Sequence, residues 1–373
     1  MATPIADDLS SRGGSQRVGS LDAVRGMAIL AVIATHSLSA TVAATGSYTI
    51  PPPIFRAFDF GQFGVQLFFA LSGWLLFALY TGTNDFSQKV YWSRRIARIW
   101  PLWIIFVILS FIAWGVPDSG LPTVLSLLVS IFFLGWWSSA LVAVPLGGLT
   151  IQQEVGHYVL FSFLRKRSAA FLAGTVIIGY LSQYLAQAIA AAVSDDSPIE
   201  GIAQAWLRLS LFNSWPFFLL GGAGLVIYRR WKAEGAGAVL HASPGTALMV
   251  GVAIMLGLLT TYAQETPGFF VLGYVLVLAV LAIVLDSVPV VGPVLQSIGR
   301  YSYFMYFFHF FVLRWLESIY AQLALPTGKT GALWNLLVLV AMFTIATAAS
   351  WAVGWISWRI LESPIMRWTR RNV

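Results

Sequence analysis

The sequence predicts an all-α membrane protein, a polytopic bundle of about ten transmembrane helices with both termini in the cytoplasm. Of its 373 residues, 58% are hydrophobic and only 10% are charged, whereas an average globular domain carries about 25% charged residues. Segments of mostly apolar residues recur from Leu21 to Ile360, and runs of about 18 or more such residues are typical of membrane-spanning helices. They lack the strict alternation that a barrel strand requires.

Hydropathy delimits eleven apolar stretches. They lie near residues 21–43, 60–81, 96–115, 121–142, 147–164, 169–193, 206–228, 246–264, 268–286, 299–321 and 332–357. The loops between them are too short to form a hydrophobic core, the largest being 44–59, 82–93, 194–205 and 229–245. We therefore expect one integral-membrane domain over residues 20–367. A disordered cytoplasmic tail (1–19) precedes it, and a basic cytoplasmic tail (368–373) follows.

The distribution of basic residues selects ten crossings rather than eleven. Seven basic residues precede or flank the first and third stretches on one side, taken as cytoplasmic: Arg12, Arg17, Arg25, Lys89, Arg94, Arg95 and Arg98. Eleven more would face outward if every stretch crossed: Arg165, Lys166, Arg167, Arg229, Arg230, Lys232, Arg300, Arg359, Arg367, Arg370 and Arg371. That arrangement violates the positive-inside bias. If residues 121–164 cross only once, 18 of the 22 Lys and Arg residues are cytoplasmic.

The segment 121–146 must then dip into the membrane, lie flat or pack as a short helix. Trp136, Trp137 and Pro145 fit such an interrupted piece. Irregular backbone at membrane depth is tolerated only inside protein or beside a water-filled cavity. We therefore expect a cavity next to the following helix, which carries Glu154.

The composition also excludes several classes of function. Cysteine is absent, so the chain has no disulfide, thiol nucleophile or thiolate-bound metal. No spacing typical of a metal site or of a nucleophilic serine elbow is present, and we expect no metal. The net charge of +7 reflects membrane topology rather than binding to nucleic acid.

Arg25 and His36 lie eleven residues apart in the first apolar stretch. At about 100° per residue both side chains project from one helix face, about 16 Å apart along the axis. An imidazole at mid-bilayer depth indicates a functional site. The alternatives are a helix-end cation paired with Asp22 for Arg25, and a structural histidine hydrogen-bonded between helices for His36.

Arg94, Arg95 and Arg98 open the third stretch. Their i,i+3 and i,i+4 spacings converge on one patch, and guanidinium groups match phosphate oxygens in a bidentate manner. This pattern favours a site for the phosphates of a cytoplasmic substrate. The alternative is a topogenic cluster that binds lipid headgroups.

Glu154 and His157 are one turn apart in the fifth stretch, so they can share a face and a proton. The alternative is a Glu–His pair that locks two helices. His309 lies as deep in its span as His36 does in the first, and we expect the two imidazoles near mid-bilayer. An aromatic belt at the membrane–water interface would explain the neighbouring tyrosines, but it explains Tyr306 less well. Ser72, followed by Gly73, makes a polar notch in the second stretch that favours close helix packing over a direct role.

Together these residues resemble membrane acyltransferase family 3, bacterial integral-membrane O-acyltransferases that use acyl-CoA. The resemblance covers the chain from Leu21 to Arg367. It rests on Leu21-Asp22-Ala23-Val24-Arg25-Gly26 with His36, Phe68-Phe69-Ala70-Leu71-Ser72-Gly73-Trp74, Arg94-Arg95-Ile96-Ala97-Arg98-Ile99-Trp100-Pro101, the segment from Gly299 to His309 and Leu361-Glu362-Ser363-Pro364. The sequence departs from the family around Glu154, with Leu149-Thr150-Ile151 before it and His157-Tyr158 after it. This departure concerns acceptor preference more than chemistry.

The resemblance implies ten helices, a cytoplasmic acyl-CoA donor and a catalytic histidine in the first helix. It maps the arginine–histidine pair onto Arg25 and His36, and the arginine pair of the third helix onto Arg95 and Arg98. We expect transfer of an acyl group, acetyl from acetyl-CoA above all, to a hydroxyl of a carbohydrate or lipid-linked glycan at the bacterial cell membrane.

The expected roles follow from that reaction. His36, Arg25 and Glu154 are the candidate catalytic residues, and Arg94, Arg95 and Arg98 would bind acyl-CoA. A second set, His309, Tyr306, His157 and Ser72, would support the site or line the acceptor pocket. The expected partners are acyl-CoA, the acceptor and membrane lipids, with no nucleic acid. The rival functions are a proton-coupled transporter with a relay through His36, Glu154 and His309, and a structural scaffold.

Overall fold

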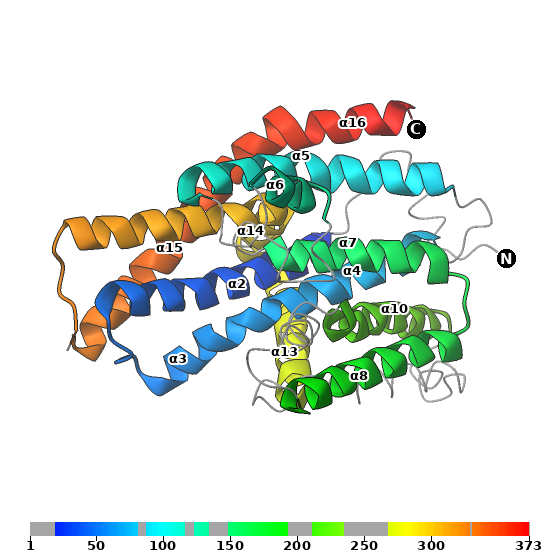
Figure 1. Ribbon diagram of the computed structural model, residues 1–373, viewed down its shortest axis with the longest axis horizontal. Helices are drawn as coiled ribbons and strands as arrows, with labels where there is room; N and C mark the ends of the chain where they lie inside the picture. The colour runs from blue at the N-terminus through cyan, green and yellow to red at the C-terminus, as the bar shows by residue number, and fades with distance from the viewer. Residues whose placement is uncertain are drawn as a thin grey trace. The chain divides into compact units, whose positions relative to one another are not determined.

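The computed structural model describes residues 19–80, 87–115, 123–133, 148–192, 211–234, 268–328 and 330–372. Every regular element among these residues is helical (Figure 1), which confirms the all-α prediction. The chain forms two compact units. The terminal unit comprises Arg17–Phe68 and Tyr274–Val373, and the central unit comprises the described residues of Phe69–Gly273. The predicted tail over residues 1–19 lies almost wholly outside the described residues.

The terminal unit contains the first and last of the described helices. Its elements are α2 (Gly19–Thr45), α3 (Pro52–Asp59), the 3-10 turn η1 (Phe60–Phe63), the start of α4 (Gly64–Tyr80), most of α13 (Gly268–Asp286), α14 (Val291–Gln322), α15 (Ala332–Ser357), the π-helical turn η4 (Trp358–Glu362) and α16 (Ser363–Asn372). In Figure 1, α2 lies along α14 and α15. The segment 44–59, expected as a loop, contains α3, whose first turn has proline at its start.

Glycines set the close approach of α2 and α14. A Cβ atom on Gly299 would collide with the backbone oxygen of Asp22, and one on Gly26 would collide with the backbone oxygen of Leu295. Small residues at a helix crossing let two backbones come together in a membrane. The crossing therefore fixes how the side chains further along α2 and α14 meet.

A polar network joins one end of α2 to the start of α15. The amide of Asn335, fully buried, donates to Ser47 Oγ at 3.1 Å and to the carbonyl oxygen of Thr49 at 3.0 Å. Its oxygen accepts a hydrogen bond from Thr330 at 2.6 Å. A buried amide is tolerated here because its donors and acceptor are all paired.

The central unit consists of the rest of α4, α5 (Gln88–Trp114), α6 (Thr123–Ile131), α7 (Gly148–Leu164), α8 (Ala169–Ala192) and α10 (Leu211–Glu234). Figure 1 shows α7, α8 and α10 lying next to one another. Glycines again mark a close crossing: a Cβ on Gly73 would collide with the backbone of Phe218, and one on Gly221 with that of Ala70. The glycines of α10 and Gly73 thus serve helix packing.

Helix α6 is too short to cross a bilayer. Its nine residues span about 14 Å, less than half of the roughly 30 Å hydrocarbon core. Its last carbonyl oxygens are bound by two indoles, because Trp100 Nε1 donates to Ile131 and Trp103 Nε1 donates to Ser130, each at 2.9 Å. A short helix is one of the three arrangements predicted for 121–146, and residues 134–146 lie outside the described part of the chain. Trp136, Trp137 and Pro145 lie outside the described residues.

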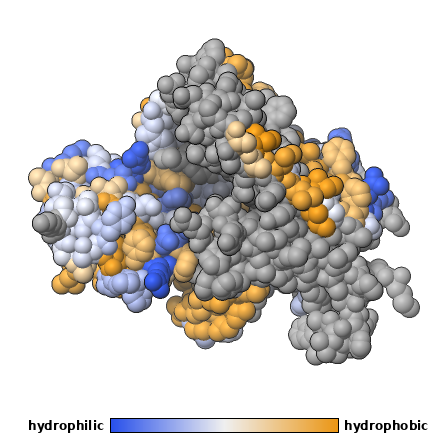
Figure 2. All heavy atoms as spheres, turned by 60° about the horizontal axis from the view of Figure 1, so that its bottom comes forward, coloured by the Kyte–Doolittle hydropathy of each residue, from blue (hydrophilic) through white to orange (hydrophobic). Residues whose placement is uncertain are grey.

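Among the residues that the structure describes, four helical segments are long and apolar enough to cross a membrane: Gly19–Thr45, Pro52–Leu79, Gln88–Trp114 and Ala332–Asn372. Figure 2 shows apolar residues gathered at the surface. The most exposed apolar side chains include Ile112 on α5, which is 77% exposed, and Val277 on α13, which is 61% exposed. Large apolar surfaces of this kind face lipid rather than water. The chain is thus a multi-pass membrane protein, whereas ten spans with both termini in the cytoplasm stay a prediction, and the stretch 246–264 lies outside the described residues.

Candidate active site

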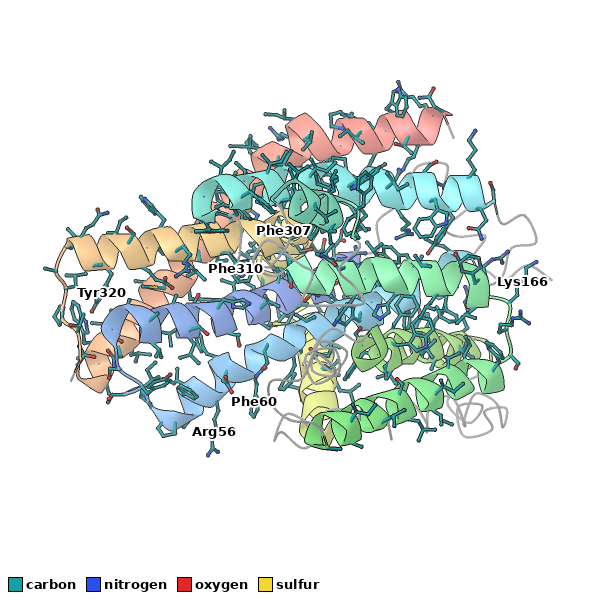
Figure 3. All side chains as sticks on the ribbon, in the orientation of Figure 1. Arg56, Phe60, Lys166, Phe307, Phe310 and Tyr320 are labelled. Carbon is teal, nitrogen blue, oxygen red and sulfur yellow. The ribbon has the colours of Figure 1, made fainter. Side chains whose placement is uncertain are left out.

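His36 on α2 and His309 on α14 come together in the terminal unit. Their ring centroids lie 5.3 Å apart, with an angle of 35° between the ring planes. Phe310, labelled in Figure 3, contacts both rings. Its ring centroid lies 4.4 Å from that of His36 and 4.1 Å from that of His309. His309 is fully buried, whereas His36 is partly exposed. The accessible imidazole of this pair is therefore His36.

The hydrogen bond of His309 fixes which of its nitrogens carries the proton. Nδ1 lies 2.8 Å from the carbonyl oxygen of Met305, one turn earlier on α14. A carbonyl oxygen only accepts hydrogen bonds, so Nδ1 is the donor. Nε2 is buried and has no hydrogen-bond partner among the described residues. In the neutral ring this nitrogen holds an unshared pair of electrons.

Arg25 pairs with Asp22. Its Nη1 lies 2.9 Å from Asp22 Oδ1, and Asp22 is buried. This is the local helix-end pair foreseen as the alternative for Arg25. Because eleven residues of helix separate Arg25 from His36, about 16 Å along the axis, any effect of Arg25 on His36 must be indirect.

Glu154 on α7 accepts hydrogen bonds from two hydroxyl groups in the central unit. Ser72 Oγ donates to Glu154 Oε1 at 2.8 Å, and the hydroxyl of Tyr158 donates to the same oxygen. His157 instead contacts Ser214, with 2.9 Å between Nε2 and Oγ. The expected sharing of a proton between Glu154 and His157 is not what the structure contains. A residue four positions along a helix lies about 40° from the first, closer than the 60° of a residue three positions along, so Tyr158 faces Glu154.

Arg95 lies over two tyrosine rings. Its guanidinium carbon is 5.3 Å from the ring centroid of Tyr158 and 5.9 Å from that of Tyr91, distances typical of cation–π contacts. The Tyr91 hydroxyl donates to the backbone oxygen of Tyr158 at 2.9 Å. Arg94 and Arg98 are exposed. Arg95 therefore connects the basic end of α5 to the Glu154 cluster, defined as Glu154, Ser72 and Tyr158.

Sequence reasoning missed Tyr91, Tyr158 and Phe310. Tyr91 and Tyr158 each stand four residues from a candidate, Arg95 and Glu154, a spacing at which helical side chains meet. That spacing was the available signal. Tyr306, an expected supporting residue, is buried in the terminal unit, with its ring centroid 6.3 Å from that of His309.

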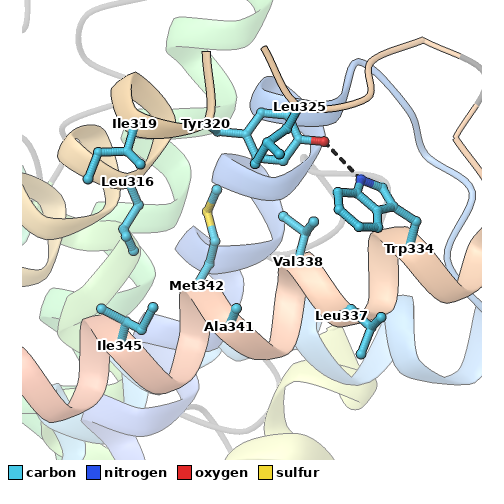
Figure 4. Close-up of a pocket in the computed structure, with 10 residues that line it drawn as sticks. All are labelled: Leu316, Ile319, Tyr320, Leu325, Trp334, Leu337, Val338, Ala341, Met342 and Ile345. Atoms are coloured by element: carbon cyan, nitrogen blue, oxygen red, sulfur yellow. Dashed lines mark hydrogen bonds between the residues drawn. The ribbon is translucent and has the colours of Figure 1, made fainter. Parts of the chain in front are cut away.

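The terminal unit also contains an apolar cavity of about 300 Å³ between the end of α14 and the start of α15 (Figure 4). Its walls include Leu316, Met342 and Ile345, and the Trp334 indole donates to the Tyr320 hydroxyl at its rim at 2.9 Å. None of the candidate site residues lines it. Among the described residues, no group of three or more His, Asp or Glu side chains is placed to hold a metal ion.

A family model described as an acyltransferase domain, that of acyltransferase family 3, matches residues 18–355. No curated protein and no solved structure matches the chain. The matched region includes every candidate site residue and nearly the whole length of the chain. The chain therefore belongs to acyltransferase family 3, and it is an acyltransferase.

Proposed function

We propose that this acyltransferase is a membrane-embedded O-acyltransferase of the bacterial cell membrane. It takes an acyl group from cytoplasmic acyl-CoA and transfers it to a hydroxyl of a carbohydrate or lipid-linked glycan. Acetyl is the acyl group that we expect. The observation that carries the proposal is the meeting of His36 with His309 between two apolar helices. Ionisable groups are costly at membrane depth and mark function there.

In this reaction His36 acts as general base on the acceptor hydroxyl. As the proton moves to His36, the hydroxyl oxygen bonds to the thioester carbonyl carbon and the carbon–sulfur bond breaks. CoA leaves as a thiolate and takes the proton from the His36 imidazolium. General-base catalysis of this kind contributes about 10²–10⁴ in rate. An acyl-histidine intermediate is the covalent variant, and it differs in that labelled acyl groups stay on the protein without acceptor.

The arginines of α5 supply the donor site. Arg94 and Arg98 are exposed and Arg95 is half-buried, so we assign Arg94 and Arg98 to the outer phosphates of CoA and Arg95 to a less exposed phosphate oxygen. Guanidinium forks bind phosphate oxygens bidentately. Arg25 orients the site through its pair with Asp22, and the Glu154 cluster positions the acceptor.

The test is CoA release by the purified protein, with radiolabelled acyl-CoA and cell-envelope glycan fractions as acceptors. His36→Ala should lower the rate of transfer by about 10²–10⁴, while binding of labelled CoA is retained. Ser39→Ala is the matched control, because Ser39 is exposed on the same helix and, among the described residues, donates a hydrogen bond to the backbone oxygen of Thr35 alone. Normal turnover by the His36→Ala protein would remove the assignment, and solute uptake without CoA consumption would favour the transporter.

A further inference from the structure

Of the two ring nitrogens of His309 on α14, one is hydrogen-bonded and the other has no hydrogen-bond partner among the described residues. Its Nδ1 hydrogen bonds to the Met305 carbonyl oxygen at 2.8 Å, so its acceptor atom is Nε2. That atom is buried and, within the described part of the chain, unpartnered. A buried acceptor without a donor costs free energy. Most buried polar atoms in native structures have a hydrogen-bond partner, and an unpaired one calls for an explanation such as a catalytic role.

The nearest imidazole is that of His36. The two ring centroids lie 5.3 Å apart. Two imidazoles joined by a hydrogen bond of about 3 Å between ring nitrogens have a similar centroid separation, because each centroid lies one ring radius behind its nitrogen. His36 is held in the described structure by ring contacts with His309 and Phe310 alone. A rotation of its ring would therefore break no hydrogen bond among the described residues, and the centroid distance leaves room for one of its nitrogens to meet His309 Nε2.

We propose that His309 is a positioning residue for His36, and this inference rests on the proposed function. Nε2 of His309 accepts the ring N–H of His36, which leaves the other His36 nitrogen unprotonated and turned toward the acceptor hydroxyl. His309 cannot itself reach the acceptor, because it is fully buried. When His36 takes the proton, the resulting imidazolium still donates to His309. One ring thus sets the tautomer of the other.

Three substitutions of His309 separate this role from simple packing. His309→Gln places an amide oxygen near the position of Nε2, His309→Asn keeps only the end near Met305, and His309→Phe keeps ring packing. We expect kcat to fall by about 10- to 100-fold in the Asn and Phe proteins, the effect of outer partners that orient histidines. The KM for acyl-CoA should not change, and Gln should recover most of kcat. Equal loss in the Gln and Asn proteins, or full activity of the Phe protein, would overturn the proposal.

A measurement on the unsubstituted protein tests the same geometry without activity. The chain has four histidines, so ¹⁵N-histidine spectra in lipid bilayers are assignable by replacing the other three singly. His309 should be the Nδ1–H tautomer with a hydrogen-bonded Nε2, and His36 should show the donating nitrogen. A proton on Nε2 of His309 would refute the proposal even if acyl transfer is demonstrated. Absence of acyl transfer with the expected tautomers would instead remove the proposed function and retain the pair.

Discussion

In the terminal unit His309 keeps a buried ring nitrogen without a hydrogen-bond partner among the described residues, whereas in the central unit one Glu154 oxygen accepts from both Ser72 and Tyr158. The first arrangement leaves an acceptor ready for a proton or a donor. The second is a satisfied network, and satisfied buried networks rigidify the helices that they join. The difference supports our proposal that the histidine pair transfers the proton and that the Glu154 cluster positions the acceptor.

Among substitutions that leave both imidazoles in place, the largest effect should come from a change at the α2–α14 crossing. In Gly299→Ala the new Cβ meets the Asp22 backbone oxygen, so α2 must move away from α14 and the histidine pair separates. A misplacement of about 1 Å costs about 10²-fold in rate. Turnover with acyl-CoA measures the loss.

Gly273→Ala is the control for that experiment. No atom of the described residues lies within 4 Å of its added Cβ, and Ala favours a helix over Gly by roughly 0.5–1 kcal/mol. It should keep full activity with unchanged or higher thermal stability in detergent. If both alanine proteins turn over normally, the geometry of the α2–α14 crossing does not govern the reaction.

Binding of acyl-CoA should depend on the geometry of the cationic groups and not only on their charge. Arg95→Lys and Arg98→Lys keep the cation but lose the bidentate fork, so the KM for acyl-CoA should rise about tenfold, as for a loss of about 1.4 kcal/mol. Arg314→Lys is the control, because Arg314 is exposed and paired with Glu317 at 3.3 Å. Acyl-pantetheine, which lacks the CoA phosphates, should be used equally by all three proteins. An equal defect with both donors would contradict the phosphate assignment.

Hydropathy predicted the helices well because a membrane leaves the backbone few alternatives to a helix. The stretch 169–193 corresponds to α8 at Ala169–Ala192, and 332–357 coincides with α15. The approach of His36 to His309 followed from equal depth, since helical rise is constant. The depth of a residue in its helix does not determine, however, toward which neighbouring helix its side chain points. The partner of Glu154 depends on which face of α4 crosses α7, and Ser72 stands 82 residues away in sequence.

The tautomer of His309 and the π-helical turn at Trp358–Glu362 were also beyond reach from sequence. Both depend on individual hydrogen bonds rather than on periodicity. The α3 helix within 44–59 had a usable signal, since Pro52 stands where proline is favoured at a helix start. Its eight residues are too few for a hydropathy window to detect.

The smallest effect should come from the satisfied network. Glu154→Gln keeps an oxygen for Ser72 and Tyr158 but removes the charge, which roughly halves the strength of such hydrogen bonds. We expect the KM for the acceptor to rise a few-fold, with kcat and the KM for acyl-CoA unchanged. Glu154→Leu leaves two hydroxyl donors without this acceptor and should also lower the unfolding free energy by about 1–3 kcal/mol.

Gln153→Leu is the matched control for the Glu154 substitutions, because Gln153 is adjacent on α7, is half-buried and has no hydrogen bond to described residues. It should leave both stability and acceptor KM unchanged. A kcat loss in Glu154→Gln as large as that of His36→Ala would show that the carboxylate takes part in proton transfer. Residues of both units would then take part in proton transfer. In that case the contrast between the unpaired Nε2 of His309 and the paired carboxylate of Glu154 would not distinguish a catalytic residue from a positioning residue.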